Sequence, residues 1–594
     1  MLLGLNRAIS SVLILTTAAH TLATDTFDYV IVGGGTCGLT VANRLSETPG
    51  VTVAVIEAGG DERNNPNVTS VAGFGLSYGT SIDWQYHTAP QVYANNQAID
   101  YHAGKALGGT STINDIGMTY IRSQKREIDT WEALGNKGWN WDSLYPYYLK
   151  SERFQIPTKA QAVAGASYVE EYHGWKGHMK VGYPYRLLNG SFPSLVRETW
   201  KRLGMFQNPD ANGGDLHGFS VWPQTLDRAA NVREDAARAY YYPVQARPNL
   251  VVYRGIATRI LWQEGSQSSG KALATGVQYV SPDGVLGTIH AAKEVILSAG
   301  SIRSPAILEL SGIGNPNILD RYNISTKVPL PGVGENAQDQ ANTAIMFSTN
   351  MTLNGTAPYV TYESIHDLFG SQADDMARST AQQIKDWSRE IAKANGDGVY
   401  AASVEKLLSV QHDMIFHKNI SCVEILTTAS GHNLASAFWI SFPFSRGNVH
   451  IRSASPLDYP VINPNYFMVD WDTALQMKIK ELVMKYWTSG PISSIVGDRI
   501  QPNMSTIPKD ATADEWTTWV KSSFSANHHL LGTAAMLPRE VGGVVDENLT
   551  VYGTENVRVI DASVLPMQVS GHLTSTLYAV SERAADMIKG NGRL

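Results

Sequence analysis

One segment near the N-terminus constrains the fold of this chain more than any other. Phe27–Val32 is an apolar, β-branched run that is typical of a buried parallel strand. Residues 39–45 have the composition of a helix, and Val51–Ile56 form a second strand-like run. A strand, a helix and a second strand in this order make a βαβ unit, so the sequence predicts an α/β fold around a parallel sheet.

The turn between the first strand and the helix has the spacing G-x-G-x-x-G. Gly33 permits the tight turn, Gly35 lets the backbone approach a pyrophosphate, and Gly38 lets the helix pack closely on the strand. Thr36 lies within the same turn, at a helix N-terminus whose free amides favour negative charge. Glu57, directly after the second strand, is placed to accept hydrogen bonds from an adenosine ribose. The segment therefore predicts a dinucleotide site, without deciding between FAD and NAD.

Size and charge narrow the classes of protein further. A chain of 594 residues is long enough for more than one domain, and 43% hydrophobic with 17% charged residues describes an ordinary folded protein. The net charge is −7 and no stretch carries a basic cluster, which argues against a nucleic-acid partner. A small, neutral substrate fits this balance better than an anionic polymer.

The first 23 residues indicate a cleaved secretory signal. Arg7 precedes a short apolar run around residues 12–15, and Thr21-Leu22-Ala23 resembles a signal-peptidase site. The apolar run is too short to span a bilayer, and no later segment is a plausible membrane span. We therefore expect a secreted, extracellular protein; an ordinary N-terminal tail is the alternative.

Asn-x-Ser/Thr tripeptides agree with export, because they are acceptors for N-glycosylation. They begin at Asn67, Asn189, Asn323, Asn350, Asn354, Asn419, Asn503 and Asn548. The chain has only two cysteines, Cys37 and Cys422, and Cys37 lies in the glycine turn, where a disulfide would be awkward. A domain of this size does not need disulfides, so their absence does not contradict secretion.

Four further stretches identify the family. Gly104–Asn114 is a Gly- and Thr-rich loop whose backbone amides could meet a phosphate or a ring carbonyl, and residues 295–314 predict a strand followed by a helix that a glycine turn closes. Gly332–Asp339 and Val559–Ser563 follow in the same order. Together these stretches resemble the glucose–methanol–choline (GMC) oxidoreductases, a family of FAD-dependent alcohol oxidoreductases, from about residue 27 to 590. Residues 82–86 and 231–240 are most similar to the secreted fungal glucose oxidases and FAD-dependent glucose dehydrogenases.

The resemblance implies a fold of α/β type, α+β overall. We expect a Rossmann-like FAD-binding domain built from discontinuous segments, and a substrate domain with an antiparallel sheet and helices. Along the chain this gives a FAD-binding region at 24–340, a substrate-domain insertion at 341–440 and a C-terminal region with the catalytic histidines at 441–590. Besides the residues of the first turn and Glu57, the resemblance assigns cofactor contacts to Gly108, Gly109, Thr110, Ser111, Asn114, Asp561, Ala562 and His572.

The family carries a histidine before a short Gly-Thr segment and a second His or Asn some forty residues later. In SFSANHHLLGT, residues 523–533, His529 matches the first position, and His572 matches the second. If this segment is extended, Asn527 and His529 point to one side and His528 to the other, where it would pack.

These positions imply roles in alcohol oxidation. Neutral His529 would be the base that takes the hydroxyl proton, while the flavin N5 takes the hydride. His572 and Asn527 would orient the hydroxyl. A long helix is predicted from Leu573 to Ile588, with its N-terminus facing the flavin. Ile113 stands where relatives that bind FAD covalently have a histidine, so we expect noncovalent FAD.

Several positions affect the expected substrate. Ser525 stands where glucose-oxidising relatives have an Arg that meets sugar hydroxyls, and Phe74 stands where the dehydrogenases have a Tyr; both changes remove hydrogen-bonding groups. Glu424 matches an acidic pocket residue of the dehydrogenases, with a plain surface carboxylate as the alternative. In the relatives a Gly follows directly after the residue that corresponds to Asn114, whereas here Asp115 and Ile116 intervene. These two residues are either an insertion near the flavin or an error in the gene model.

The leading hypothesis is a secreted FAD enzyme that oxidises the CH–OH group of a sugar or another alcohol and passes electrons to oxygen or a quinone-type acceptor. The runner-up acts on a primary alcohol of a fungal secondary metabolite, which Ser525 and Phe74 would favour. A different class is an inactive flavin- or carbohydrate-binding protein. We expect no metal site, and a homodimer is compatible with the sequence.

Overall fold

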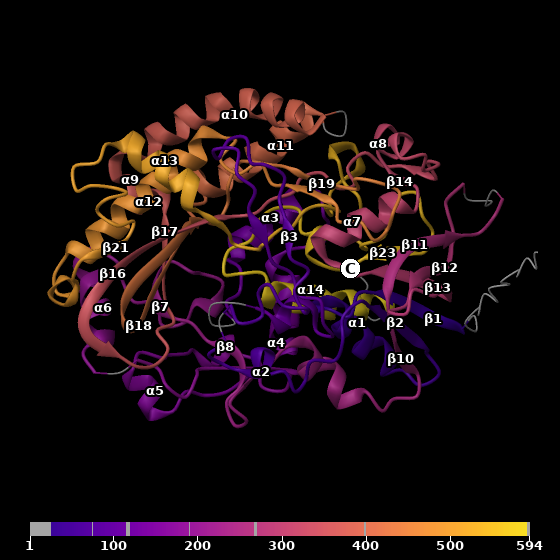
Figure 1. The fold of residues 1–594 in the computed structure, drawn as a ribbon, viewed down its shortest axis with the longest axis horizontal. Helices are drawn as coiled ribbons and strands as arrows, with labels where there is room; N and C mark the ends of the chain where they lie inside the picture. The colour runs from indigo at the N-terminus through magenta and orange to yellow at the C-terminus, as the bar shows by residue number, and fades with distance from the viewer. Residues whose placement is uncertain are drawn as a thin grey trace, which may run out of the picture.

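A computed structural model describes residues 25–73, 75–114, 119–188, 190–265, 270–396 and 400–590. Two large sheets lie on opposite sides of the molecule, and the C-terminal helix α14 (Thr574–Ile588) runs through the region between them (Figure 1). The mixed α/β fold, with one Rossmann-like part and one antiparallel part, confirms the predicted class. The predicted signal segment, Phe74, Asp115, Ile116 and Asn189 lie outside the described residues.

The first sheet has seven strands in the order β10-β2-β1-β13-β12-β11, with β23 pairing β13. Neighbours from β10 through β13, and the pair β13–β23, are parallel, while β12 and β11 extend the sheet in antiparallel fashion. The strands are β1 (Asp25–Val32), β2 (Val53–Glu57), β10 (Leu250–Arg254), β11 (Ile256–Trp262), β12 (Ala274–Val280), β13 (Leu286–Leu297) and β23 (Val557–Val559). Segments from both ends of the chain thus build one sheet, as a discontinuous domain requires.

Three of these parallel strands end at the same edge of the sheet. Val32 pairs with Leu297, and Leu297 pairs with Val559, so the chain leaves β1, β13 and β23 side by side. The glycine turn, Ser298 and Asp561 follow at this edge. Ligands of open α/β sheets bind outside the carboxyl ends of the strands, and the sequence places its glycine motif there.

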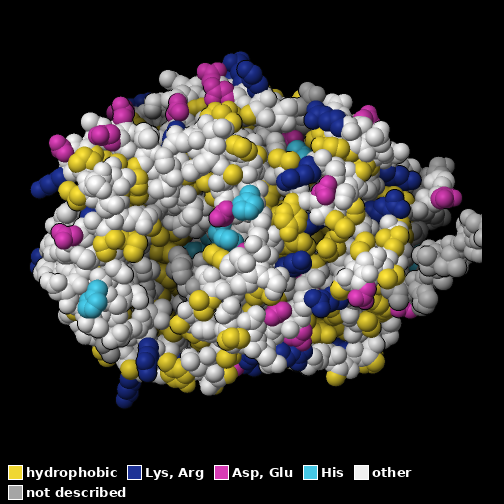
Figure 2. Space-filling view, viewed as in Figure 1, with side chains coloured by type: hydrophobic (Ala, Val, Ile, Leu, Met, Phe, Trp, Pro, Cys, Tyr) yellow, Lys and Arg dark blue, Asp and Glu magenta, His cyan; other side chains and the backbone are white. Residues whose placement is uncertain are grey.

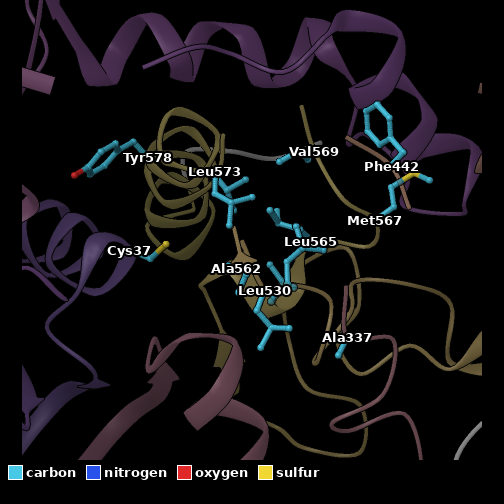
Figure 3. Packing of buried hydrophobic residues seen from close by; sticks show 14 of the residues in the cluster. Cys37, Ala337, Phe442, Leu530, Ala562, Leu565, Met567, Val569, Leu573 and Tyr578 are labelled. Atoms are coloured by element: carbon cyan, nitrogen blue, oxygen red, sulfur yellow. The ribbon is translucent and has the colours of Figure 1, made fainter. Parts of the chain in front are cut away.

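Helices cover this sheet and carry the glycine turn. α1 (Thr36–Ser46) follows the turn and packs against α14, which in turn packs against α4 (Trp141–Ser151). α7 (Gly300–Leu310) follows β13, and the helix predicted from Leu573 begins one residue later as α14. Figure 3 shows Tyr578 on the helix α14 and Leu573 directly before its start, with Cys37 of α1, Leu530 and Ala562 nearby.

The second sheet is antiparallel and lies on the other side of the molecule (Figure 1). Its order is β21-β16-β18-β17-β7, and the short β22 pairs with the start of β16. The strands are β7 (Gly218–Val221), β16 (Ala341–Leu353), β17 (Tyr359–Ser364), β18 (Ser421–Ile440), β21 (Arg499–Gln501) and β22 (Ser525–Ala526). Three of these six strands come from outside residues 341–440, so this half is also discontinuous in sequence.

Helices pack around the second sheet. α12 (Asp470–Thr488) lies against β18, and α10 (Ala373–Asn395) packs on α11 (Ala401–His412) along one edge of the molecule (Figure 1). α10 is polar on its exposed side, and its buried side includes Ile384, Trp387 and Ile391. Among the described residues, none of the helices is both long and apolar enough to cross a membrane.

The remaining elements lie outside the two large sheets. The remaining helices are α2 (Pro66–Thr69), α3 (Lys125–Ala133), α5 (Lys159–Val163), α6 (Phe192–Arg202), α8 (Pro316–Arg321), α9 (Ile365–Phe369) and α13 (Ala513–Ser523). The remaining strands are β3 (Tyr86–His87), β4 (Asp100–Tyr101), β5 (Glu152–Phe154), β6 (Met179–Gly182), β8 (Gln224–Asp227), β9 (Val232–Arg233), β14 (Ile313–Gly314), β15 (Val328–Pro329), β19 (Asn448–His450) and β20 (Val461–Asn463).

Candidate active site

The glycines of the first turn are required by close backbone contacts. Gly33 has φ +102°, in the left-handed region, and a Cβ there would lie 2.3 Å from the Ser298 carbonyl oxygen. A Cβ on Gly38 would lie 1.9 Å from the Gly33 carbonyl oxygen, so the helix can approach the strand only without a side chain. Gly35 faces Gly109, on which a Cβ would come within 2.6 Å of the Gly35 Cα. The two glycine-rich segments therefore touch backbone to backbone, and Gly33, Gly35 and Gly109 form a cradle in the wall of a cavity.

Glu57 lies beside this cradle and is held by the backbone. Its two carboxylate oxygens accept the amides of Gly34 and Gly59, each at 2.7 Å. Burial raises the pKa of Glu57 to about 7 in spite of these bonds. Each oxygen keeps a free lone pair, so the carboxylate suits a ligand that brings hydroxyl donors, as a ribose does.

The second glycine loop and the end of β23 complete this part of the site. Ser111 Oγ donates to the Gly108 carbonyl at 2.6 Å and accepts the Ala236 amide, which fixes the loop. The Asp561 carboxylate is fully used: one oxygen accepts the Gly300 amide and the Ser304 hydroxyl, and the other accepts the amide and hydroxyl of Ser563. Asp561 therefore ties β23 to the start of α7. Thr36, Thr110, Asn114 and Ala562 also line the cavity described next.

One cavity of about 960 Å³ joins this cradle to the second sheet. At one end lie Gly33, Glu57 and the 255–257 segment, and at the other lie His529 and His572 with residues of β16 and β18. The surface shows histidine side chains near the middle of the face between the two halves (Figure 2). Because one cavity has both the glycine cradle and the histidines in its lining, a single dinucleotide could reach both.

His529 lies at the histidine end of the cavity and is held by a buried glutamine. Its Nδ1 is 2.8 Å from Gln340 Oε1, and its backbone amide donates to Asp339 Oδ1 at 2.9 Å. Asn527 Nδ2 donates to the same Gln340 oxygen at 2.9 Å, and the amide of Asn342 bonds Asn527 Oδ1 at 3.3 Å. Burial, and then the neighbouring His572 and His528 rings, keep the pKa of His529 well below 6.5, so the imidazole is neutral at physiological pH.

His572 faces His529 across the same part of the cavity. The two ring centroids are 4.9 Å apart in an edge-to-face arrangement, and Trp439 meets the edge of the His572 ring at 5.7 Å. His572 Nε2 is 2.9 Å from Glu424 Oε1, and the Glu424 side chain is buried. Glu424 is therefore not a surface carboxylate, which was the alternative left by the sequence.

The backbone is unusual at His528, next to His529, and at His572. His528 has φ +58° and His572 has φ +69°, both in the left-handed region that non-glycine residues seldom adopt. Gly571, directly before His572, has φ +73°, and a Cβ there would lie 2.8 Å from the Arg122 carbonyl oxygen. Strained backbone of this kind is held only where the surrounding packing requires it, and it is frequent at functional sites.

The expectation of an extended segment at 527–529 is wrong, because β22 ends at Ala526 and the chain turns at His528. The side chains nevertheless point as expected. Asn527 and His529 share Gln340, while His528 packs edge-on against Tyr101 and Tyr78. Burial, followed by the nearby His102, lowers the pKa of His528 to about 3, so it is a neutral packing ring.

One face of the second sheet forms the wall opposite the histidines. Alternate residues of a strand share a face, and the lining includes Asn342 and Ala344 of β16 and Leu426, Ala437 and Trp439 of β18. Glu424 lies two residues before Leu426 and so faces the same way. Ser525 is exposed beside Asn342, its register partner in β22, and Gln501 and Phe524 also line this end. The wall is mostly apolar, with amide and hydroxyl groups at its rim.

Sequence reasoning missed four residues of this site: Gln340, Asn342, Trp439 and Tyr466. Gln340 directly follows the Gly332–Asp339 motif, which was the only local signal for it. Its partners, Asn527 and His529, are 187 and 189 residues away in sequence. Tyr466 donates to Asp339 Oδ2 at 2.5 Å and anchors the carboxylate that holds the His529 backbone.

The structure also shows the surroundings of the predicted glycosylation sites and of the two cysteines. Of the seven described glycosylation candidates, Asn67 is half-buried and donates through Nδ2 to the Leu76 carbonyl. The other six are exposed: Asn323, Asn350, Asn354, Asn419, Asn503 and Asn548. Within the described ranges, Cys37 and Cys422 are free and buried, and no group of three or more His, Cys, Asp and Glu side chains could hold a metal ion.

The fold and the cavity define a dinucleotide-binding oxidoreductase with a pair of histidines at one end. The sequence matches two models of the family described as GMC oxidoreductase, over residues 27–342 and 443–581. The chain belongs to this family and is an FAD-dependent oxidoreductase.

Individual relatives are similar to this chain over nearly its whole length. The chain is 48% identical to the glucose oxidase-like protein fsoC of Humicola fuscoatra, covering 97% of this chain and 99% of that protein. The solved structure of an FAD-dependent oxidoreductase from Chaetomium thermophilum is similar with a TM-score of 0.86 at 28% identity, covering 96% of this chain and all of that chain. A fungal aryl-alcohol oxidase is similar with a TM-score of 0.83 at 25% identity, covering 96% and 99%.

Proposed function

We propose that this enzyme oxidises the CH–OH group of a neutral alcohol with an apolar body, with His529 as the base. The observation that carries the proposal is the histidine pair. Two imidazoles with ring centroids 4.9 Å apart, each held by one protein acceptor, face the cavity that also contains the glycine cradle. A hydroxyl group between them would meet a proton acceptor and a second imidazole.

The residues present fit FAD. Gly33, Gly35 and Gly109 line the cavity without side chains, so a pyrophosphate could approach their backbone, and Glu57 is placed for the ribose. We assign Gly33, Thr36 and Gly38 to the pyrophosphate end and Gly108–Ser111, Asn114, Asp561, Ala562 and His572 to the rest of the cofactor, with Asp561 acting through the backbone that it fixes. When bound, FAD supplies the acceptor for the hydride that leaves the substrate carbon.

We assign FAD binding as noncovalent, since Ile113 stands at the expected attachment position and is an apolar, buried side chain. Denaturation followed by filtration should release the yellow cofactor, and retention on the chain would refute this assignment.

The proton moves to the unprotonated nitrogen of His529. The low pKa of this ring keeps it neutral before reaction, so it is ready to accept at any physiological pH. His572 holds the same hydroxyl from the other side, oriented by Glu424 through Nε2. Asn527 holds Gln340 through one N–H and accepts from Asn342, and its second N–H and remaining oxygen lone pair can orient the hydroxyl.

The wall of the substrate end favours an alcohol with an aromatic or aliphatic body. Leu426, Ala437, Ala344 and Trp439 offer apolar contacts, and Ser525 offers one hydroxyl at the rim. Such a surface gains by burying apolar atoms and gives a polyol few partners. The similarity to an aryl-alcohol oxidase supports this choice.

Glucose is the second candidate, because Asn342, Gln501 and Ser525 could bind sugar hydroxyls and the 48% identical relative is named glucose oxidase-like. The test is anaerobic bleaching of the bound flavin by benzyl alcohols, aliphatic primary alcohols and glucose. Fast bleaching by the apolar alcohols and slow bleaching by glucose is the expected result. The reverse order would overturn the substrate assignment while leaving the reaction class intact. Bleaching by none of a wide panel would favour the inactive binding protein.

We further propose that the protein is secreted and that electrons pass to oxygen or to a quinone-type acceptor. The sequence of residues 1–23 and the six exposed glycosylation candidates support secretion. Turnover with oxygen compared with turnover with a quinone identifies the acceptor. Mass spectrometry of the protein from culture medium identifies its N-terminus and the modified asparagines.

A further inference from the structure

We propose that Gln340 is a positioning residue that sets the tautomer of His529, so that Nδ1 carries the proton and Nε2 keeps the lone pair. The proposal builds on the role of His529 as base. Gln340 lies directly before β16 and its side chain is buried. It touches His529 and Asn527 without lining the cavity, so it acts on the reaction only through those two side chains.

The orientation of the Gln340 amide follows from chemistry. Its Nε2 donates to the Ser441 carbonyl oxygen at 2.9 Å, and a carbonyl oxygen can only accept. Oε1 therefore faces the other way, where it meets the Asn527 amide nitrogen at 2.9 Å and His529 Nδ1 at 2.8 Å. A flipped amide would set oxygen against oxygen at Ser441 and two donors against each other at Asn527.

The orientation of Gln340 fixes the proton on His529. An amide oxygen has no proton to give, so a hydrogen bond at 2.8 Å requires that Nδ1 donate. Asn527 Nδ2 and His529 Nδ1 are then two donors that converge on one acceptor, Gln340 Oε1, and this explains why they lie 3.1 Å apart. A neutral imidazole with its proton on Nδ1 has its lone pair on Nε2, which is the nitrogen that a base needs.

The arrangement is held rigidly. Asp339 Oδ1 accepts the amides of Gln340 and His529 at 2.8 and 2.9 Å, so one carboxylate fixes both backbones. The backbone carbonyl oxygen of Gln340 accepts the backbone N–H of Asn527 at 3.0 Å. This bond completes a closed ring of contacts. The buried amide thus has a defined geometry, as the selection of one tautomer requires.

Other titratable groups surround His529, and none of them replaces this contact. They are His572 with Glu424, His528 with His102 and Asp83, and Asp339 with Tyr101 and Tyr466. Of these, only the Asp339 carboxylate bonds His529, and it does so at the backbone amide. Gln340 is neutral, so it orders the proton without adding a negative charge that would favour the imidazolium.

The test compares Gln340→Met, which removes the acceptor, with Gln340→Glu, which keeps its shape and adds charge. Gln476→Met is the matched control, because Gln476 is also a buried amide that bonds the start of β16, through Thr343 and Ala341, without touching either histidine. The first readout is the protonation of each His529 nitrogen in histidine-selective ¹⁵N spectra of the holoenzyme, assigned with His529→Ala. The second is the pH profile of anaerobic flavin bleaching by an alcohol.

We expect Nδ1 of His529 to be protonated in the wild type and the two tautomers to mix in Gln340→Met. The bleaching rate of Gln340→Met should fall about tenfold or more with apparent substrate affinity little changed, as for a lost buried hydrogen bond. In Gln340→Glu, the carboxylate should favour the imidazolium and move the acid limb of the profile to higher pH. Gln476→Met should keep the wild-type spectrum and profile even if it lowers the melting temperature.

Protonation on Nε2 in the wild type would overturn the proposal, as would Gln340→Met with wild-type tautomer and rate. If Gln340→Met does not fold, the wild-type spectrum and Gln340→Glu decide the matter: an unmoved profile in Gln340→Glu counts against the proposal. The role of His529 is judged separately. If His529→Ala is inactive and Gln340→Met is normal, only the role of Gln340 is rejected. If His529→Ala is active, the role of His529 as base is rejected.

Discussion

Replacing Glu424 tests how the second histidine contributes. The Glu424 side chain is buried, and its Oε1 lies 2.9 Å from His572 Nε2. A hydrogen bond to a charged group contributes about 1.5–3 kcal/mol, roughly twice a neutral one. Glu424→Gln keeps an acceptor but loses the charge, so about 1–1.5 kcal/mol is lost, which corresponds to about tenfold in rate. Glu424→Ala removes the acceptor entirely and should lower the rate about 100-fold.

The assay is the single-turnover rate of flavin bleaching by a saturating alcohol in anaerobic stopped flow. Glu363→Gln is the matched control. Glu363 is a buried carboxyl on β17, the strand that pairs with the Glu424 segment, and burial together with the charge of Asp367 raises its pKa to about 8. At pH 7 it is mostly protonated, so glutamine is close to it in shape and charge. A wild-type rate in Glu424→Gln, or an equal loss in Glu363→Gln, would refute the reasoning.

Three further changes test separate parts of the account. Gly38→Ala places a Cβ 1.9 Å from the Gly33 carbonyl oxygen, so it should cost about 1–3 kcal/mol of stability and lower the FAD content. The melting temperature and the visible flavin absorbance per chain measure these two effects, and full FAD content at unchanged stability would count against the cradle. The pKa of Glu363 is about 8 in the folded chain and 4.5 in the free group, so the folded state keeps this proton up to a higher pH than the unfolded state does. The contribution of Glu363 to the free energy of unfolding therefore falls as the pH rises from 4.5 to 8. Glu363→Gln should flatten this part of the pH dependence of the melting temperature, and an unchanged slope would contradict it. His528→Phe should keep the bleaching rate within about threefold, because neutral His528 packs against Tyr78 and Tyr101 and accepts only the His102 backbone amide, at 3.3 Å. A loss as large as that of a catalytic change would assign His528 a chemical role.

Much of the fold could be predicted because its determinants are local. The glycine turn, its flanking strands and the acid at Glu57 lie within one stretch, and Gly38 must lack a side chain because of Gly33 in the same turn. The contact that excludes a side chain at Gly33 is not local, because it comes from Ser298. The helix after His572 was likewise visible in its apolar periodicity, and α14 begins within one residue of the predicted start. The antiparallel half was predicted only as a class, because β7, β21 and β22 come from distant parts of the chain.

The surroundings of the histidines could not be predicted for the same reason. Gln340 meets His529 across 189 residues, and Glu424 meets His572 across 148. No periodicity or spacing encodes such pairings, since they depend on how β16 and β18 pack against the C-terminal segment. The parity argument at residues 527–529 gave the correct sides for the side chains although its premise of an extended strand was wrong, because the left-handed turn at His528 also sends that ring away from its neighbours.

The measurement that tests the central proposal most directly is the anaerobic single-turnover rate of His529→Ala with a primary alcohol, run beside the wild type with normal and α-deuterated substrate. The variant should bind FAD with an unchanged spectrum, and its bleaching rate should fall by about 10²–10⁴-fold, the range expected for loss of a general base. The wild type should show slower bleaching with the deuterated alcohol, because the same step breaks the C–H bond. A His529→Ala rate within a few-fold of wild type would contradict the account.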